Sequence, residues 1–501
     1  MSIAAQRALF YATDSTACRS KNQTPPVPQR RKGKDNWQNL QVRFDDPHLT
    51  GRAGMPLVFL HERNLDMAGK LGRAIKLQRR SDAFRPSECS KFLIDTKIEG
   101  IERLYHLKEP RLDPVYQREY GLTELPCGKT MGQYLKALED NHIDSLDRLN
   151  QRFSDHLVRK ALRRAEERAG GMDAEEPAPP RSESWQEVIE RDQQGRIKVG
   201  IDYDSSCMTV YGKQEESDQG RNPRNKDKPG FQPKFAFLAG LDVMIHQRLY
   251  PQSTGLGSGF EDYHRQTLAR LPRGTVAGWV RGDGAIYSQD NVRMFERQDL
   301  TFAVTAQKTS HMWRAIDLLP EESWQTFEDE NGKTVELAEL YYKPATWPGP
   351  RRVFILSRRL KNSSQQKLVE EEKYEIYAYL TNYEGSLWER FKFCVGRCTV
   401  EKCIRESKLG FDWNHLPCAE FSANRAYLGH VQLAYNLMIS FRLTALGGNA
   451  TRWSADTVRR RLLAIPGRFS PRNPDILHLP EWWPHRHHLR HACRELTDFK
   501  A

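Results

Sequence analysis

The chain has 501 residues, a formal net charge of +12 and a mean hydropathy of −0.73, so it is long, polar and basic. Its 21 Phe, 18 Tyr and 11 Trp supply large side chains for a core, and this length favours two or three domains. No apolar run approaches the roughly 18 residues of a membrane helix, and the nine cysteines, without paired short spacings, favour reduced thiols over a disulfide framework.

Basic residues are spread along the chain in pairs and triplets, namely Arg79-Arg80, Arg163-Arg164, Arg351-Arg352, Arg358-Arg359 and Arg459-Arg460-Arg461. Dispersed positive charge suits DNA, because each phosphate that a cation neutralises releases condensed counterions. Charge alone fits a basic protein without a nucleic-acid partner equally well. The start of the chain lacks the apolar segment of a secretion signal, so we expect a cytoplasmic, nucleoid-associated protein with no membrane partner.

The first 190 residues divide into three parts by composition. Residues 1–36 are polar and contain Pro25-Pro26 and a basic cluster, which predicts a flexible leader. Apolar residues then recur at three-to-four-residue steps within 57–168, which predicts a helical N-terminal domain. Glycine, proline and acidic residues are concentrated within 169–190, and this composition is typical of a linker.

After the linker the hydrophobic period changes from that of a helix to that of a strand. Residues 197–204 alternate between apolar and other residues, so Asp202 and Asp204 share one face of a predicted strand. A second apolar run, 276–280, stops at Arg281-Gly282-Asp283-Gly284, which places Asp283 at a strand end before a glycine turn. A third short strand is expected over 300–305.

The second half of the chain is expected to complete an α/β fold. Short polar strands, over 334–337, 352–356 and 374–381, predict a β-rich insertion at 326–382. This insertion separates the two parts of a catalytic core, 191–325 and 383–465. The helix that follows the insertion carries Arg397, Glu401 and Lys408, which lie within about 40° of one another around the helix axis. The apolar segment 428–446 is expected to be buried, and residues 466–501 form a basic C-terminal tail.

Three carboxylates in this arrangement suit metal-dependent cleavage of a phosphodiester. Two divalent cations activate the nucleophile and stabilise the leaving oxygen in such reactions, and hard cations prefer carboxylate ligands. Asp204 and Asp283 end strands, and Glu401 lies on a helix beside two cations. Each signal alone is weak, because a strand-end Asp is most often a turn former and an Arg-x3-Glu-x6-Lys face is usually a solvated ion-pair surface.

The sequence around these carboxylates resembles that of DDE transposases from bacterial insertion sequences. Residues 201–206, Ile-Asp-Tyr-Asp-Ser-Ser, resemble the first-aspartate region, and residues 281–284 resemble the second-aspartate turn. Residues 397–408 match the Arg-x3-Glu-x6-Lys part of the Tyr-x2-Arg-x3-Glu-x6-Lys signature, and Phe421-Ser422-Ala423-Asn424 follows as in that group. The resemblance covers roughly residues 57–465.

This resemblance implies a ribonuclease H-like catalytic core that a β-strand insertion interrupts, after a helical domain that recognises terminal inverted repeats. It implies that Asp204, Asp283 and Glu401 are the catalytic residues and hold two Mg²⁺ or Mn²⁺ ions, while Arg397 and Lys408 bind DNA. The implied activity is cleavage of double-stranded DNA at the ends of an insertion sequence and strand transfer into target DNA. Joining two ends implies a homodimer or a larger synaptic complex.

Two departures from the family pattern and one ambiguity remain. Cys394 occupies the position of the signature tyrosine, and serine replaces threonine after Asp204. Because Asp202 shares a strand face with Asp204, strand periodicity does not decide between them, and the family pattern favours Asp204. Two other functions stay open: a catalytically silent, domesticated DNA-binding protein, and a ribonuclease H-like nuclease that does not transpose.

Other motifs are weaker. The spacing C-x3-C-x4-C of Cys394, Cys398 and Cys403 lacks the paired knuckles of a structural zinc site. The glycine-rich segment 255–259 is not followed by Lys-Ser/Thr, so ATP is not expected. Three tryptophans could stack on a base that is flipped out of a DNA duplex, but packing in the protein core is the favoured interpretation for each of them. They are Trp324, Trp347 and Trp388. A basic aromatic tail packed on the core, rather than a metal site, is expected from His485, His487, His488 and His491.

Overall fold

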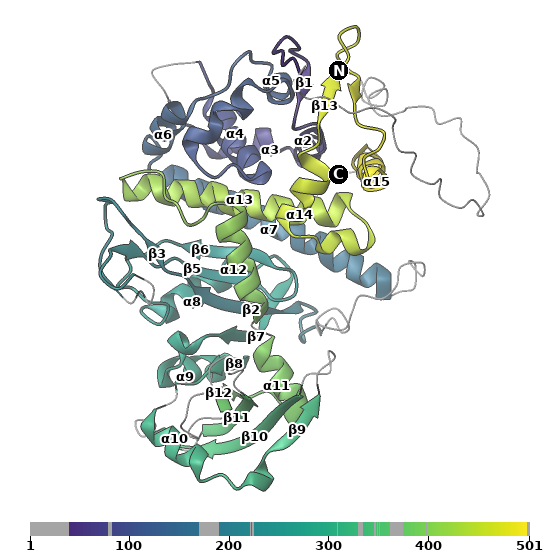
Figure 1. Cartoon of the computed structure of the whole chain (residues 1–501). Helices are drawn as coiled ribbons and strands as arrows, with labels where there is room; N and C mark the ends of the chain where they lie inside the picture. The colour runs from purple at the N-terminus through teal and green to yellow at the C-terminus, as the bar shows by residue number, and fades with distance from the viewer. Residues whose placement is uncertain are drawn as a thin grey trace, which may run out of the picture.

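The computed structural model describes residues 40–78, 83–169, 190–220, 222, 225–307, 309–328, 334–344, 347, 349, 351–360, 374–396 and 398–497. The expected leader, 1–36, and nearly all of the expected linker, 169–190, lie outside these residues, as does Arg397. The described elements form a helical layer, a pair of long helices and a mixed sheet (Figure 1).

The N-terminal part is helical, as the three-to-four-residue period predicts. Its helices are α2 (Met55–Asn64), α3 (Met67–Ala74), α4 (Pro86–Glu99), α5 (Pro114–Tyr120), α6 (Gly128–Lys136) and α7 (Asp140–Ala169). Helix α4 illustrates the local reasons, because Pro86 fits its first turn and Gly100, at φ 98°, ends it in the left-handed region. The periodic apolar residues of α7 are buried, among them Leu146, Leu149 and Phe153.

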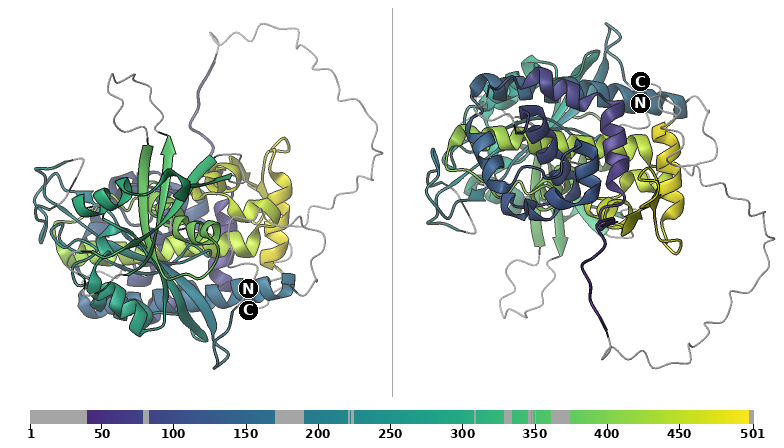
Figure 2. Two further views of the ribbon diagram at one scale, coloured as in Figure 1. Left: turned by 90° about the horizontal axis from the view of Figure 1, so that it is seen from below. Right: turned by 90° about the horizontal axis from the view of Figure 1, so that it is seen from above.

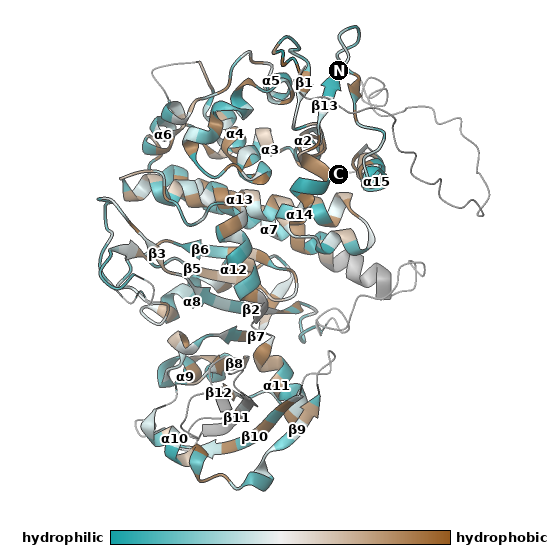
Figure 3. Ribbon diagram, in the orientation of Figure 1, coloured by the Kyte–Doolittle hydropathy of each residue, from teal (hydrophilic) through white to brown (hydrophobic). Residues whose placement is uncertain are grey.

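Helix α13 (Phe421–Ala445) is buried over almost its whole length, as expected for the segment 428–446. It packs against α7, α4 and strand β6 (Val243–Arg248), and α7 also contacts β6. Figure 3 shows hydrophilic and hydrophobic residues mixed along it. The buried amides of Gln432 and Asn436 explain this mixture, since both donate to Met244 O, at 3.0 and 2.9 Å, and Asn436 Oδ1 accepts from Met244 N at 3.1 Å. These bonds satisfy the backbone at the outer strand of the sheet.

One mixed nine-stranded sheet contains most of the described strands, in the order β6-β5-β2-β7-β8-β12-β11-β10-β9. Strands β2 (Ile197–Ser205), β7 (Thr275–Gly282) and β8 (Thr301–Thr305) are parallel, and β5 (Lys234–Leu238) is antiparallel to β2 and β6. Residues 199–204 of β2 are all buried, which is expected of a central strand covered on both faces. Helices α8 (Phe260–Leu268) and α9 (Gln289–Arg297) follow β6 and β7 along the chain.

The strand-rich segment does not form a sheet of its own. Strands β9 (Gln325–Glu328), β10 (Thr334–Tyr342), β11 (Arg351–Leu360) and β12 (Tyr374–Thr381) include the three strands expected from the sequence. Strand β12 pairs with β8, with Leu380 opposite Val304, so strands β9 to β12 extend the central sheet beyond its parallel strands. Helix α10 (Ser310–Asp317) lies before β9 in the chain and packs against β10.

The C-terminal segment folds back onto the N-terminal helices. Strand β13 (Gly467–Phe469) pairs with β1 (Leu49–Thr50), and helix α15 (Arg486–Thr497) packs against α2 (Figure 2, right). Leu489 and Leu496 of α15 are buried, and Asn64 Nδ2 donates to Leu496 O at 2.7 Å. The expected basic tail is therefore an integral part of the packed structure. Among the described helices, none has the length and apolar character needed to cross a membrane.

Candidate active site at the ends of the central strands

Asp204 and Asp283 lie at neighbouring ends of the parallel strands β2 and β7. Tyr203 pairs with Gly282 in this ladder, so the next residue of each strand is one of the two aspartates. A backbone N–H orients each carboxylate: Asp204 Oδ1 accepts from Ser205 N at 2.7 Å, and Asp283 Oδ1 accepts from Ala285 N at 3.0 Å. Asp204 is 8% exposed and Asp283 is half-buried. Two carboxylates are thus held side by side at one edge of the sheet.

Asp202 has a different environment from Asp204, although both lie on the same face of β2. It pairs in register with Arg281, and the guanidinium binds both carboxylate oxygens, with Nε to Oδ1 at 2.7 Å and Nη2 to Oδ2 at 2.9 Å. Asp202 is 1% exposed, so this is a buried bidentate ion pair between adjacent strands. Both oxygens of Asp202 therefore have a structural partner.

Arg281 also reaches the junction between helices α11 (Leu387–Val395) and α12 (Cys398–Gly410). Its Nη1 donates to Phe393 O at 3.3 Å, and its guanidinium lies 5.8 Å from the centre of the Phe393 ring. A Cβ atom added at Gly396 would lie 2.0 Å from Arg281 Nη1, so a side chain there would displace the guanidinium that Asp202 holds. The Arg281 side chain thus connects the two aspartate-bearing strands to the start of the helix that carries Glu401.

Helix α12 packs against β2 through a buried face. Val400, Cys403 and Ser407 lie on that face at three-to-four-residue steps, while Glu401 is exposed in the first turn. Lys408, near the other end, donates from Nζ to Cys207 O at 3.3 Å and so binds the loop that follows β2. Arg397 precedes α12 and lies outside the described residues, so the expected common face is described only for Glu401 and Lys408.

The residues at the strand ends have the donor chemistry that a hard divalent cation takes, because two carboxylates lie on adjacent strands and a third is on the helix beside them. Among the described residues, however, no group of three or more His, Cys, Asp or Glu side chains is placed to hold one metal ion. The side chains of Asp204, Asp283 and Glu401 therefore do not converge as those of a closed site do. The donor set fits Mg²⁺ or Mn²⁺ in its chemistry, and two of its members follow paired residues of adjacent strands.

The cysteines and tryptophans singled out from the sequence are packing residues where they are described. Burial raises the pKa of the Cys394 thiol to about 12, and Cys403 is buried as well. Trp347 is 6% exposed and stacks on Tyr287, with ring centres 5.5 Å apart. Trp388 stacks on Phe327 at 5.3 Å. The side chain of Cys398 lies outside the described residues.

The histidines of the C-terminal segment surround an aromatic side chain. The rings of His485 and His488 lie edge-on to Trp453, and Arg461 lies over its face at 4.6 Å. This is the packed basic aromatic arrangement expected from the sequence.

Sequence reasoning did not find Arg281 and Gly396. A signal for Arg281 was present, because Asp202 precedes Asp204 by two residues just as Arg281 precedes Asp283. If the two aspartates end paired strands side by side, the residues two positions earlier, Asp202 and Arg281, also lie opposite each other and bring opposite charges together. No comparable signal marks Gly396, whose requirement arises only from the path of the Arg281 side chain.

The chain was compared with curated proteins, with solved structures and with models of protein families. No curated protein matches the chain in sequence. Among solved structures, the chain is similar to piggyBac transposase in a synaptic complex with hairpin DNA, at a TM-score of 0.36 and 11% identity, over 90% of this chain and 82% of that one. The family model described as transposase DDE domain group 1 matches residues 32–501, nearly the whole length, and the chain therefore belongs to this DDE transposase family.

Proposed function

We propose that this protein is a transposase that cleaves DNA at the inverted-repeat ends of a bacterial insertion sequence and joins the freed ends to target DNA. Membership of the DDE family supports this, since its members typically cleave DNA and transfer strands. The observation that carries the proposal is the position of Asp204 and Asp283 at neighbouring strand ends, beside the helix that bears Glu401. The positive charge of +12 is consistent with double-stranded DNA as the substrate.

We assign Asp204, Asp283 and Glu401 as the catalytic, metal-binding residues. The ion pair of Asp202 supports Asp204 as the ligand, because both oxygens of Asp202 already bind Arg281. When bound, two divalent cations activate the attacking oxygen and neutralise charge on the leaving oxygen. The exposed position of Glu401 on the first turn of α12 lets its side chain complete the set from the helix side.

The cations around the site bind and orient DNA in this proposal. Lys408 binds the loop after β2 and lies on the helix that carries Glu401, and we assign its ammonium group a phosphate contact. Arg397 fills the same role at the start of α12. The Arg281–Asp202 pair positions the strands and the helix relative to one another and does not contact the DNA.

The order of the strands supports a ribonuclease H-like core. Strands β6, β5 and β2 are consecutive antiparallel neighbours, and β7 and β8 continue the sheet in parallel with β2. The first catalytic aspartate then lies on the central strand and the second on its parallel neighbour. Because two element ends must be held together for joining, the active form is a homodimer or a larger assembly on DNA.

The test is cleavage of the element's end sequences in Mg²⁺ by the full-length protein. Asp204→Asn, Asp283→Asn and Glu401→Gln are expected to abolish nicking and leave end binding intact. Asp290→Asn, which changes an exposed carboxylate in the first turn of α9, is the matched control and keeps activity. Nicking that persists in Glu401→Gln overturns the site.

The same assay separates the alternative functions. Cleavage by the wild type without joining to a target plasmid identifies a nuclease that does not transpose. End binding by the wild type without any cleavage identifies a catalytically silent DNA-binding protein.

A further inference from the structure

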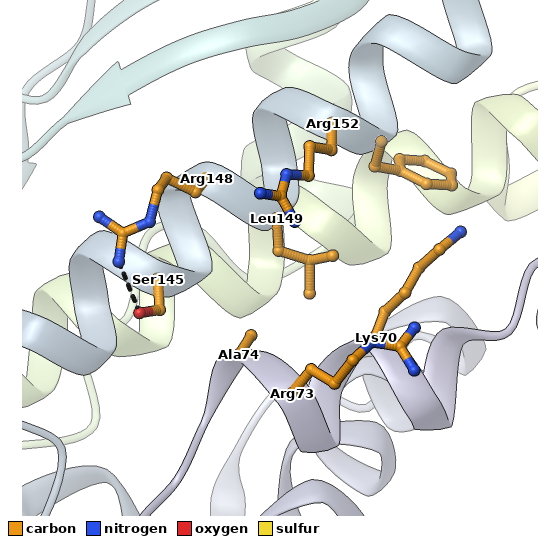
Figure 4. A pocket seen from close by; sticks show the side chains of 8 residues that line it. Lys70, Arg73, Ala74, Ser145, Arg148, Leu149 and Arg152 are labelled. Atoms are coloured by element: carbon orange, nitrogen blue, oxygen red, sulfur yellow. Dashed lines mark hydrogen bonds between the residues drawn. The ribbon is translucent and has the colours of Figure 1, made fainter.

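A cleft of about 370 Å³ lies between helices α3 and α7, away from the strand ends described above. Figure 4 shows that cationic side chains from both helices border it. Its apolar floor is formed by Ala74, Leu149 and Phe153, and its polar lining by Lys70, Arg73, Ser145, Arg148 and Arg152. Four of these eight lining residues are cationic and none is acidic, so the cleft is a concave positive surface.

The cations of the cleft are only lightly neutralised by the protein. Arg73 pairs with Asp66 at 2.7 Å, but both side chains are more than 60% exposed, so water screens this pair. Arg148 donates to the neutral Ser145 Oγ at 2.8 Å, and Lys70 donates to Leu65 O at 2.5 Å. Partial burial lowers the pKa of Lys70, and the opposing attraction of Asp66 does not offset this effect.

The other side of α7 shows what a neutralised surface looks like in this protein. There Asp144 and Asp147 line a second cleft together with Arg248, Arg270 and Arg425, and Arg270 pairs with Asp147 at 3.5 Å. On the α3 side, by contrast, Arg148 and Arg152 are like charges four residues apart, an arrangement that weakens a helix. A concentration of cations that folding does not favour points to an anionic ligand.

We propose that the cleft between α3 and α7 binds the phosphate backbone of double-stranded DNA, an inference that rests on the proposed function. Arg148 and Arg152 are separated by a rise of about 6 Å along α7, and each strand of a duplex carries one phosphate per about 3.4 Å of its axis, so the two side chains can reach different phosphates of one strand. Arginine forks bind phosphate oxygens bidentately. Contacts of this kind hold DNA in place without reading its sequence.

A long polyanion fits better than a small phosphate compound or an acidic peptide. Arg159 lies on the same face of α7, about 20° around the axis from Arg148 and about 16 Å further along. It is exposed and pairs with Asp155 at 2.8 Å within its own helix. The cationic line therefore extends beyond the cleft, as a backbone contact requires and a small ligand does not.

The test compares DNA binding by two matched double variants of the full-length protein. Arg148→Gln with Arg152→Gln removes two cations from the cleft, and Arg293→Gln with Arg297→Gln removes two exposed arginines at the same spacing on α9. Both are made with Asp283→Asn so that the DNA stays intact. Binding of a fluorescent 30-base-pair duplex of arbitrary sequence is followed by anisotropy from low to high KCl.

Loss of two phosphate contacts is expected to reduce the slope of log K against log salt by about 1.8 for the cleft variant and to weaken binding at least tenfold near 0.1 M salt. The α9 variant is expected to keep the slope of the parent protein. Equal slopes in all three proteins overturn the inference, and so does an equal loss in both variants. Competition by polyglutamate as strong as that by DNA would assign the cleft to an acidic peptide instead.

Cleavage by the same arginine variants with Asp283 restored separates this inference from the proposed function. If the cleft only positions DNA, the cleft variant shows a raised KM and an unchanged kcat on the element's ends. If the wild type binds the duplex through the cleft but cleaves nothing, the proposed function is wrong, whereas the inference that the cleft binds DNA is supported. If the wild type cleaves, and the cleft variant has the KM of its parent and the same slope of log K against log salt, the inference about the cleft is wrong and the proposed function is supported.

Discussion

Arg281 and Asp202 form a buried bidentate ion pair between the two strands that end in Asp283 and Asp204. The pair lies two residues behind the aspartates, so it fixes the spacing of the strands without occupying their ends. It also separates two carboxylates that periodicity alone leaves equivalent. One carboxylate of β2 is neutralised inside the protein, and the other lies beside a second carboxylate where a cation would relieve their repulsion.

This difference predicts opposite effects on stability. Asp202→Asn leaves a buried guanidinium without its anion and is expected to lower the free energy of unfolding by about 3 kcal/mol. Asp204→Asn removes one of two adjacent like charges and is expected to leave the stability unchanged or slightly higher. Urea denaturation of both variants without added metal checks this. Equal destabilisation by the two changes would contradict the distinction drawn between them.

Gly396→Ala is expected to destabilise the protein by about 1–3 kcal/mol, because the added methyl group overlaps Arg281 Nη1. The cost is expected to shrink in an Arg281→Met background, which a double-mutant cycle measures as a coupling energy. Gly132→Ala is the matched control, since Gly132 lies within α6 with open space around it. There alanine is expected to raise stability by about 0.5–1 kcal/mol. Equal costs with and without Arg281 would rule out the contact.

The buried histidine His430 predicts a loss of stability in acid. Burial lowers its pKa to about 4, and its ring bonds to Ala426 O and Ser90 Oγ. Between about pH 6.5 and pH 4 the unfolded chain protonates this histidine and the folded protein does not, so stability falls as the pH falls, by up to about 3 kcal/mol. Denaturation of the wild type and His430→Phe at pH 7 and pH 5 measures the effect. The variant should lose less stability on acidification, and an identical loss would refute the assignment.

Removal of divalent cations is expected to stop cleavage without unfolding the protein. The described residues contain no cluster of three metal-ligand side chains, and the thiols of Cys394 and Cys403 are packed in the interior. The melting temperature is therefore expected to stay within about 2 °C after treatment with EDTA, whereas loss of a structural zinc site would unfold a domain. Mg²⁺ or Mn²⁺ should restore cleavage fully. A large fall in melting temperature would show a structural metal.

The sequence predicts the local elements of this fold better than their assembly. The change of period at residue 197 locates β2, and the apolar run after Phe421 indicates a buried helix, because these signals arise from burial along a single element. The union of the insertion with the core sheet was not predictable. It depends on the pairing of β12 with the outer edge of β8. The sequence of a strand does not indicate which other strand it will pair with.

The candidate site shows the same division. The strand ends at Asp204 and Asp283 follow from alternation and a glycine turn, and their adjacency follows once β2 and β7 are known to be parallel. The role of Gly396 depends on the three-dimensional path of one arginine side chain. The ion pair that distinguishes Asp202 from Asp204 likewise could not be predicted, because the strand period of two places both residues on the same face.

The return of the C-terminal segment to the N-terminal helices has a consequence for synthesis of the protein. Strand β1 has its partner β13 more than 400 residues later, and α2 is covered by α15 at the far end of the chain. These N-terminal elements therefore remain incompletely packed until residues 467–497 have been synthesised, and their closure is a slow, long-range step. A chain that ends before residue 467 lacks both β13 and α15, so its strand β1 and helix α2 would expose the surfaces that these elements cover.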